Sequence, residues 1–157
     1  PFTTVGIGLA IGLSGIGSGA ANLGICAAGF GLAVAGLKVN SVGTCIAHFI
    51  GSPKMSMANV IAKPKILLPM LCSSALLGVL AAVFSIQGTP ASAGFGFSGL
   101  VGPIYALNLM ENGWTVGNIL LVAVIFVVAP IIFNIIFIHV FEKVVQWIQP
   151  EDYKLTV

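Results

Sequence analysis

The side chains in this sequence that could do chemistry are mostly uncharged. Hydroxyl, amide and imidazole groups lie within apolar stretches, while charged residues make up only 6 % of the 157 residues and Arg is absent. Such groups donate and accept hydrogen bonds without formal charge, which suits the recognition of a small polar solute. The side chains predicted to bind this solute are Ser18, Asn22, Thr44, His48, Gln87, Thr89 and Asn108.

The sequence contains no arrangement typical of an enzyme. Three of the four carboxylates, Glu142, Glu151 and Asp152, lie near the C-terminal end of the sequence. No P-loop or zinc-binding spacing occurs, and the three cysteines are isolated from one another. We therefore expect no catalytic residues, no metal and no cofactor.

The composition places the chain in a membrane. A soluble domain carries roughly a quarter charged residues, far more than the 6 % found here. The net charge of +2 and the lack of a basic patch argue against nucleic-acid binding. We expect an all-α membrane protein, in which residues 1–157 form one polytopic bundle with broken helices and re-entrant hairpins. Because the chain starts at Pro1, we expect it to be part of a longer protein.

The elements that must position these side chains are organised around the Gly-rich stretch 5–37. One helix of that length would rise about 50 Å, whereas the hydrocarbon core of a bilayer is about 30 Å thick. We therefore predict a broken span, with the break at Ser14–Gly19, where Gly weakens the helix and Ser offers competing hydrogen bonds.

Residues 40–50 are too short to span a bilayer, and Ser41, Thr44 and His48 share one helical face. The segment is either a re-entrant half-helix, in which His48 has a function, or an interfacial helix, in which His48 lies at the surface. The following loop 51–65 holds three of the six lysines. By the positive-inside rule we expect this loop to be cytoplasmic.

Two conventional spans are predicted at 66–84 and 118–141, the second kinked by Pro130. Residues 142–157 then form a polar cytoplasmic tail. The stretch 85–110 is polar and Gly-rich at first, but no charged residue occurs between Lys65 and Glu111. We expect it to be a re-entrant hairpin with a helical arm at 100–110. The alternative is an ordinary exported loop with a short surface helix.

The run GIGLAIGLSGIGSGAANLGICAAGFGLAVAGLKVNSVGTCIAHFIGSPKMSMANV, together with GTPASAGFGFSGLVGPI and the closing PEDYKL, resembles the membrane component EIIC of the bacterial phosphotransferase system. It is most similar to the C-terminal half of the divergent branch that includes toxin-regulatory membrane proteins. The resemblance implies a multi-pass bacterial inner-membrane protein, a homodimer and a cytoplasmic IIB-type phosphocarrier. Sugar-transporting relatives use an intramembrane Glu in a GITE-like motif, which this sequence lacks.

The function expected from the residues and the resemblance together is that of a permease for a small polar solute such as a sugar, embedded in the lipid bilayer. The alternative is a membrane sensor or regulator that has a permease-like fold and transports nothing itself. A rotary proton-ring subunit would need a carboxylate in mid-span, and neither 66–84 nor 118–141 contains one.

Overall fold

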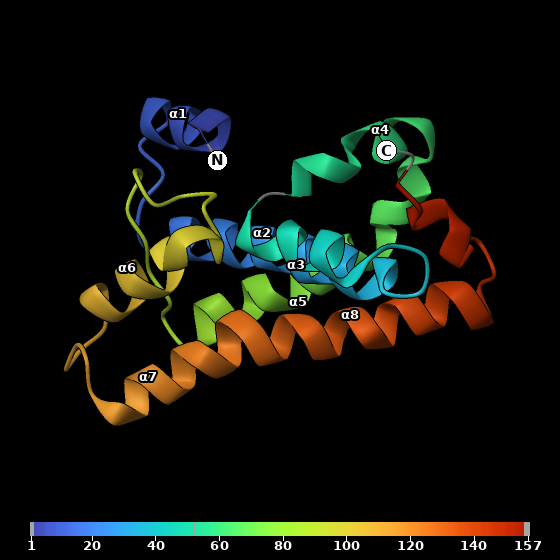
Figure 1. Ribbon diagram of the computed structural model, residues 1–157. Helices are drawn as coiled ribbons and strands as arrows, with labels where there is room; N and C mark the ends of the chain where they lie inside the picture. Colours follow the sequence, from blue (N-terminus) through green and yellow to red (C-terminus); the bar gives the residue numbers. More distant parts are fainter. Residues whose placement is uncertain (1, 52, 156–157) are drawn as a thin grey trace.

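The computed structural model describes residues 2–51 and 53–155 as an all-α bundle (Figure 1). The α-helices of these residues are α1 Phe2–Ala10, α2 Gly15–Gly36, α3 Val42–Ile50, α4 Met57–Ala62, α5 Leu68–Val83, α6 Val101–Leu109, α7 Val116–Ala123 and α8 Ala129–His139. Short 3-10 turns precede α4 and α5, at Pro53–Ser56 and Pro64–Leu67. Within the described residues, an isolated bridge between Gly15 and Gly88 is the one β-type pairing.

Three helices are long and apolar enough to cross a bilayer: Gly15–Gly36, Pro64–Val83 and Val116–Val144. The last is continuous because π-helical turns link α7 to α8 and extend α8. In the most apolar 18 residues of each helix, 67 % of α2 is buried, against 33 % and 28 % in the other two. Thus α2 is the central span, and the predicted all-α membrane fold is confirmed.

Asn134 joins the three spans in the interior of the bundle. Its Nδ2 donates to the carbonyl oxygens of Ala27 in α2, at 2.9 Å, and of Pro130 in its own helix, at 2.8 Å. Its Oδ1 accepts from the Ser73 hydroxyl of α5 at 3.1 Å. Asn134 is fully buried. Such interhelical hydrogen bonds hold membrane helices together where hydrophobic association is weak.

The break in the Gly-rich stretch lies at residues 11–14, one turn before the predicted Ser14–Gly19. Gly12 and Gly15 take left-handed backbone angles, with φ of +64° and +61°, which glycine adopts at little cost. Ser14 is extended and precedes α2 at the N-cap position, without a side-chain capping hydrogen bond. Gly17 and Gly19 then continue as regular helix, so the prediction that the helix breaks at these two residues is wrong.

The neutral segment after α5 folds back along the first half of α2. Gly88 exchanges two backbone hydrogen bonds with Gly15, at 2.9 and 3.0 Å. One turn along α2, the Ser18 hydroxyl donates to the carbonyl of Thr89 at 2.8 Å. One further turn along, Asn22 Oδ1 accepts from the backbone N–H of Gly96 at 3.1 Å. The segment is therefore fastened to three successive turns of the central span.

Residues 38–51 and 53–63 fold back along the other half of α2, where α3 lies against it (Figure 1). Gly29 makes room for this approach, because a Cβ there would lie 3.1 Å from the carbonyl oxygen of His48. The chain then returns through α4 to Lys63, near the end of α2. The predicted loop 51–65 thus contains α4 and two 3-10 turns.

The C-terminal segment, residues 147–155, packs against the bundle. The sequence predicted a polar tail for residues 142–157. Asp152 and Tyr153 are buried. The Tyr153 hydroxyl donates to the carbonyl of Ile66 at 3.1 Å, and Asn40 Nδ2 donates to the carbonyl of Tyr153 at 2.8 Å. The segment therefore closes the end of the bundle at which α2 ends and α5 begins.

Two lysines neutralise the buried Asp152 carboxylate. Lys63 Nζ lies 2.5 Å from its Oδ1, and Lys65 Nζ lies 3.4 Å from its Oδ2. Burial would raise the pKa of Asp152, but the hydrogen bonds from Lys63 and from the backbone N–H of Gln149, together with Lys65, hold that pKa below its usual value. The charged form of Asp152 is therefore favoured in the folded protein.

Replacing Gly19 by Ala should destabilise the protein by about 1–3 kcal/mol, because the new Cβ would overlap the carbonyl oxygen of Ile86. Gly78→Ala is the matched control. It is also helical but has nothing within 4 Å of a Cβ, and it should be neutral or slightly stabilising. The unfolding midpoint of each variant is measured by heating in detergent with a thiol-reactive dye, which labels the buried Cys26 and Cys45 as they become exposed. Equal midpoints for the two variants would contradict the close packing of residue 86 on α2.

Acid should destabilise the wild-type protein through Asp152. A carboxyl whose pKa is lowered on folding contributes stability that is complete above its unfolded pKa of about 3.9 and is lost as the pH falls through the folded value. Thermal midpoints measured from about pH 6 down to about pH 3 should therefore fall less steeply in Asp152→Asn than in the wild type. The neighbouring Glu151→Gln serves as control, and an unchanged pH dependence in Asp152→Asn would count against this assignment.

Candidate functional site

Two segments fold back along α2: the first comprises residues 38–51 and 53–63, and the second comprises residues 85–99. They start from opposite ends of α2 and meet beside its middle. At their tips, the Ser98 hydroxyl donates to the carbonyl of Gly51 at 2.7 Å. The tips are thus residues 49–51 of the first segment and 94–98 of the second. Meeting points of irregular backbone beside a span are where transporters commonly place polar solutes.

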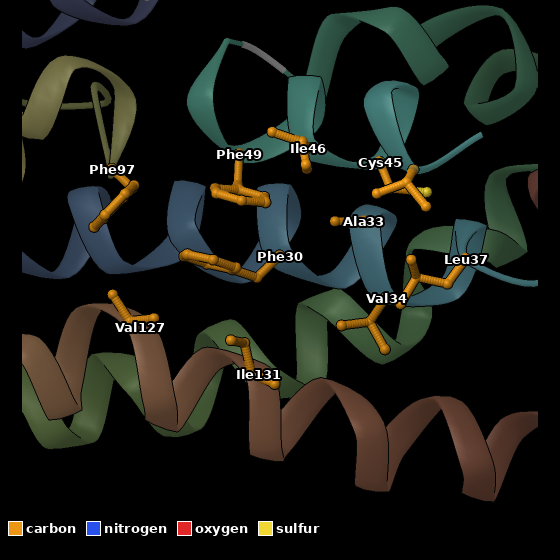
Figure 2. A pocket seen from close by; sticks show the side chains of 11 residues that line it. Phe30, Ala33, Val34, Leu37, Cys45, Ile46, Phe49, Phe97, Val127 and Ile131 are labelled. Carbon is orange, nitrogen blue, oxygen red and sulfur yellow. The ribbon is translucent and has the colours of Figure 1, made fainter. Parts of the chain in front are cut away.

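On one side of the tips lies an aromatic cluster (Figure 2). Phe49 of α3 stacks on Phe30 of α2, with ring centroids 4.7 Å apart, and Phe97 packs edge-on against Phe30 at 5.6 Å. The surrounding pocket extends between α3, α2 and α8, and every side chain lining it is apolar. It offers no hydrogen-bonding side chain to a polar solute, so it is a poor candidate for a polar solute site.

On the other side of the tips lies a cavity of about 300 Å³. It is lined by Thr4, Ile25, Ala28, Leu32, Gly51, Pro53, Lys54, Met57, Val60, Leu67, Gly94, Phe95 and Ser98. Its polar side chains come from three separate elements: Thr4 from α1, Lys54 from the turn before α4, and Ser98 from the second tip. The Thr4 hydroxyl also donates to the carbonyl of Gly94 at 3.4 Å, which ties α1 to this wall.

We name this space the tip cavity. It has the features of a small-molecule site, namely mostly apolar walls, a few convergent polar groups and a volume at the lower end of the common range of about 300–1,000 Å³. Lys54 contributes a positively charged side chain to the wall, and Gly51 contributes exposed backbone. The cavity can therefore accept a compact polar molecule.

Three of the predicted solute-binding residues bind the chain itself. Ser18 and Asn22 are buried and fasten the second segment to α2, as described above. Thr89 forms a tight turn, in which its hydroxyl accepts from the backbone N–H of Ser92 at 3.2 Å. These residues position the segment that carries Gly94 and Ser98, and they do not line the tip cavity.

His48 and Thr44 hold the first segment together. His48 is 1 % exposed, so it is not a surface residue. Its Nδ1 lies 2.8 Å from the carbonyl of Thr44, which can only accept, so Nδ1 carries the hydrogen. Nε2 of the neutral ring then accepts from the Ser56 hydroxyl at 2.7 Å, which links α3 to the returning chain. The Thr44 hydroxyl pairs with that of Ser41 at the start of α3.

The last two predicted residues lie at the end of the bundle where α5 ends and α7 begins. Gln87 lines a separate polar cavity there. Asn108 is exposed, and its Oδ1 accepts from Trp114 Nε1 at 2.7 Å. The structure therefore distributes the seven predicted residues over α2, both segments and one end of the bundle, and it does not gather them in one cavity.

The sequence did not single out Thr4 or Ser98 as solute-facing residues, and Lys54 was interpreted as a topological charge. Ser98 and Gly94 belong to the neutral stretch 85–99, so their segment could be identified but their orientation could not. Thr4 carries no signal in the sequence, because its place in the cavity depends on the turn at residues 11–14.

Asn22→Ala should loosen the second tip, because the Gly96 N–H would lose its partner and remain buried. We expect faster amide hydrogen exchange in residues 94–98, with a loss of stability of about 1–3 kcal/mol. Asn108→Ala is the control, since its side chain is exposed and accepts a hydrogen bond from Trp114, away from residues 94–98. Unchanged exchange at residues 94–98 in Asn22→Ala would show that this hydrogen bond does not hold the tip.

Comparison with known proteins agrees with the architecture. The family model described as "Phosphotransferase system, EIIC" matches residues 1–155 of the chain. Searches of curated proteins and of solved structures return no match. The family match spans nearly the whole chain and confirms the resemblance seen in the sequence. With its three apolar spans, the chain belongs to the EIIC family of the phosphotransferase system, as an integral membrane protein of the permease component.

Proposed function

We propose that this chain holds the solute-translocating centre of an EIIC permease and that the solute binds in the tip cavity. The observation that supports this most directly is the contact between Ser98 and Gly51, where two segments from opposite ends of α2 meet beside a cavity lined by both. A solute at this position would lie near mid-span, with access to either end controlled by one segment.

The proposal includes re-entry of both segments into the membrane. Asn22 is the eighth residue of α2, so the Gly96 N–H that it binds lies about 10 Å along the helix from its start. A loop that stayed in water outside the membrane would not contact α2 so far from its start. This supports a re-entrant hairpin at 85–110, and the matching return of 38–65 supports a second one from the other end.

The proposed solute is a small sugar or a related polar metabolite. The tip cavity is compact, and its polar side chains are two hydroxyls and one ammonium group. Family membership favours a sugar that is passed to a cytoplasmic IIB-type phosphocarrier. Lys38, Lys63 and Lys65 pair with Glu142 and Asp152 at the end of the bundle where α2 ends, which favours a cytoplasmic location for that end and for the C-terminus.

We also propose that two copies associate as a homodimer. The outward faces of α5 and of the helix Val116–Val144 are largely exposed and apolar, with Leu71, Val79, Leu120 and Ile132 among the exposed side chains. Such faces can contact lipid or a second copy. Cross-linking in the membrane would distinguish these two environments.

Transport by reconstituted protein tests the tip cavity. Initial uptake of a panel of radiolabelled sugars into proteoliposomes should fall about tenfold in Ser98→Ala and in Lys54→Gln, because each variant removes a polar group from the cavity. Asn22→Ala and His48→Ala should also reduce uptake, through loosening of the segments. The matched control is Ser74→Ala, since that hydroxyl bonds only within α5, to the carbonyl of Leu71.

Normal uptake in both Ser98→Ala and Lys54→Gln would reject the tip cavity as the solute site. A different result would favour the sensor alternative: no uptake of any sugar, combined with sugar-dependent capture of a partner protein. Trapping of the sugar as its phosphate ester, only with a phosphorylated IIB-type protein present, would support coupling to phosphorylation.

A further inference from the structure

A second cavity, polar and larger than the tip cavity, lies at the opposite end of the bundle from Lys63 and Asp152. Its volume is about 560 Å³. Its polar wall is formed by side chains that follow α5, follow α6 or begin α7: Ser85, Gln87, Glu111, Asn112 and Asn118. We name it the distal cavity. None of the residues described above as fastening the two segments lines it.

The backbone of the distal cavity is firmly held. Ser85 and Asn112 take left-handed angles, with φ of +51° and +63°, and turn the chain sharply at the ends of α5 and α6. Ile86, between the two polar residues of the first turn, is fully buried and anchors it. Gly88 is bound to Gly15 by two backbone hydrogen bonds. The cavity wall is therefore set by the fold rather than by a loose loop.

Asn118 builds the second wall. Both hydrogens of its amide are used, since Nδ2 donates to the carbonyl of Glu111 at 2.9 Å and to that of Gly113 at 2.8 Å. These bonds fix the turn at residues 111–113, which carries Glu111 and Asn112. They also leave the Asn118 Oδ1 as an acceptor without a partner in the described chain.

The remaining polar side chains of the wall are available for a ligand. In the described chain, the Gln87 and Asn112 amides, the Ser85 hydroxyl and the Glu111 carboxylate make no hydrogen bond or ion pair to protein. No Lys, Arg or His lines the cavity. Amides supply both donors and acceptors, and a carboxylate supplies acceptors only. This set matches the hydroxyl groups of a neutral polyol and would repel an anion.

The apolar part of the wall fits the same class of ligand. Phe84 and Met110 border the polar groups. A sugar ring has hydroxyls around its edge and a C–H face that packs on aromatic and thioether groups. Pockets that combine apolar walls with a few placed polar groups are typical of small-ligand sites.

We infer that the distal cavity is a capture site for a neutral polyhydroxylated solute, separate from the tip cavity. This inference rests on the proposed function, because a capture site has a purpose only in a permease. Gln87 immediately precedes the residue that fastens the second segment to α2. A solute bound there lies at the base of the segment whose tip lines the tip cavity.

Trp114 provides a local reporter for this site. It follows the turn at residues 111–113 and is bonded to Asn108. The chain's other tryptophan, Trp147, lies near the C-terminal segment and is removed by Trp147→Phe. The probes are glucose, N-acetylglucosamine and mannitol, titrated against the full chain in nanodiscs, with Ca²⁺ alone and glucose 6-phosphate as comparison ligands.

At least one neutral probe should change the Trp114 fluorescence. Gln87→Ala and Glu111→Gln should each weaken this response about tenfold, with little change in thermal midpoint, because both side chains lack protein partners. Glu151→Gln, the same change at the opposite end of the bundle, should have no effect. Ser98→Ala, in the tip cavity, should impair uptake but leave the fluorescence titration unchanged.

Three results would overturn the capture site. The first is no fluorescence response to any neutral probe. The second is a response that Gln87→Ala and Glu111→Gln leave intact. The third is a response to Ca²⁺ or glucose 6-phosphate that exceeds the response to the neutral probes. In each case, sugar uptake that remains sensitive to Ser98→Ala would leave the proposed function standing.

Discussion

The structure depends on one constraint: backbone polar groups that leave a helix inside apolar surroundings must find partners. Two buried side chains of the central span meet this need. Ser18 donates to the carbonyl of Thr89, and Asn22 accepts from the N–H of Gly96. An unpaired group at any of these places would cost more than the hydrogen bond gains, so each side chain fixes where the neighbouring segment can lie.

Glycine allows the close approach of backbone that these hydrogen bonds require. For a side chain as short as Ser18 to reach backbone, the segment must lie directly on the helix, and a Cβ on Gly19 or Gly88 would prevent this. A Cβ on Gly31 would likewise approach Asn134 Oδ1 and Met70. The Gly-rich composition of α2 is therefore a consequence of close packing by irregular chain on one face and helices on the others, as is common where membrane helices approach closely.

The length and apolar character of residues 66–84 and 118–141 were sufficient to predict two spans, and the neutral stretch at 85–99 was sufficient to predict unusual backbone. The break in the first stretch was displaced by one turn, because a run of glycines shows where a helix is weak but not which glycine takes a positive φ. The solute-binding residues were harder to predict. The partners of Ser18 and Asn22 lie 71 and 74 residues away in the sequence, so no local pattern reveals whether each side chain serves backbone or solute.

The distribution of contacts along the second segment indicates which part of it can move at the lowest cost in free energy. Its base is held by the two hydrogen bonds between Gly15 and Gly88 and by the Ser18 bond, all to the central span. Its tip meets the other segment through the Ser98 bond to Gly51 and the contact of Phe97 with Phe49. Separating the tips breaks one hydrogen bond between the segments, while the hydrogen bonds of the second segment to α2 can stay in place. Moving the base would expose several backbone groups at once. If the tip cavity binds the solute as proposed, a motion that admits the solute costs least when the anchored segments stay on α2 and the tips part.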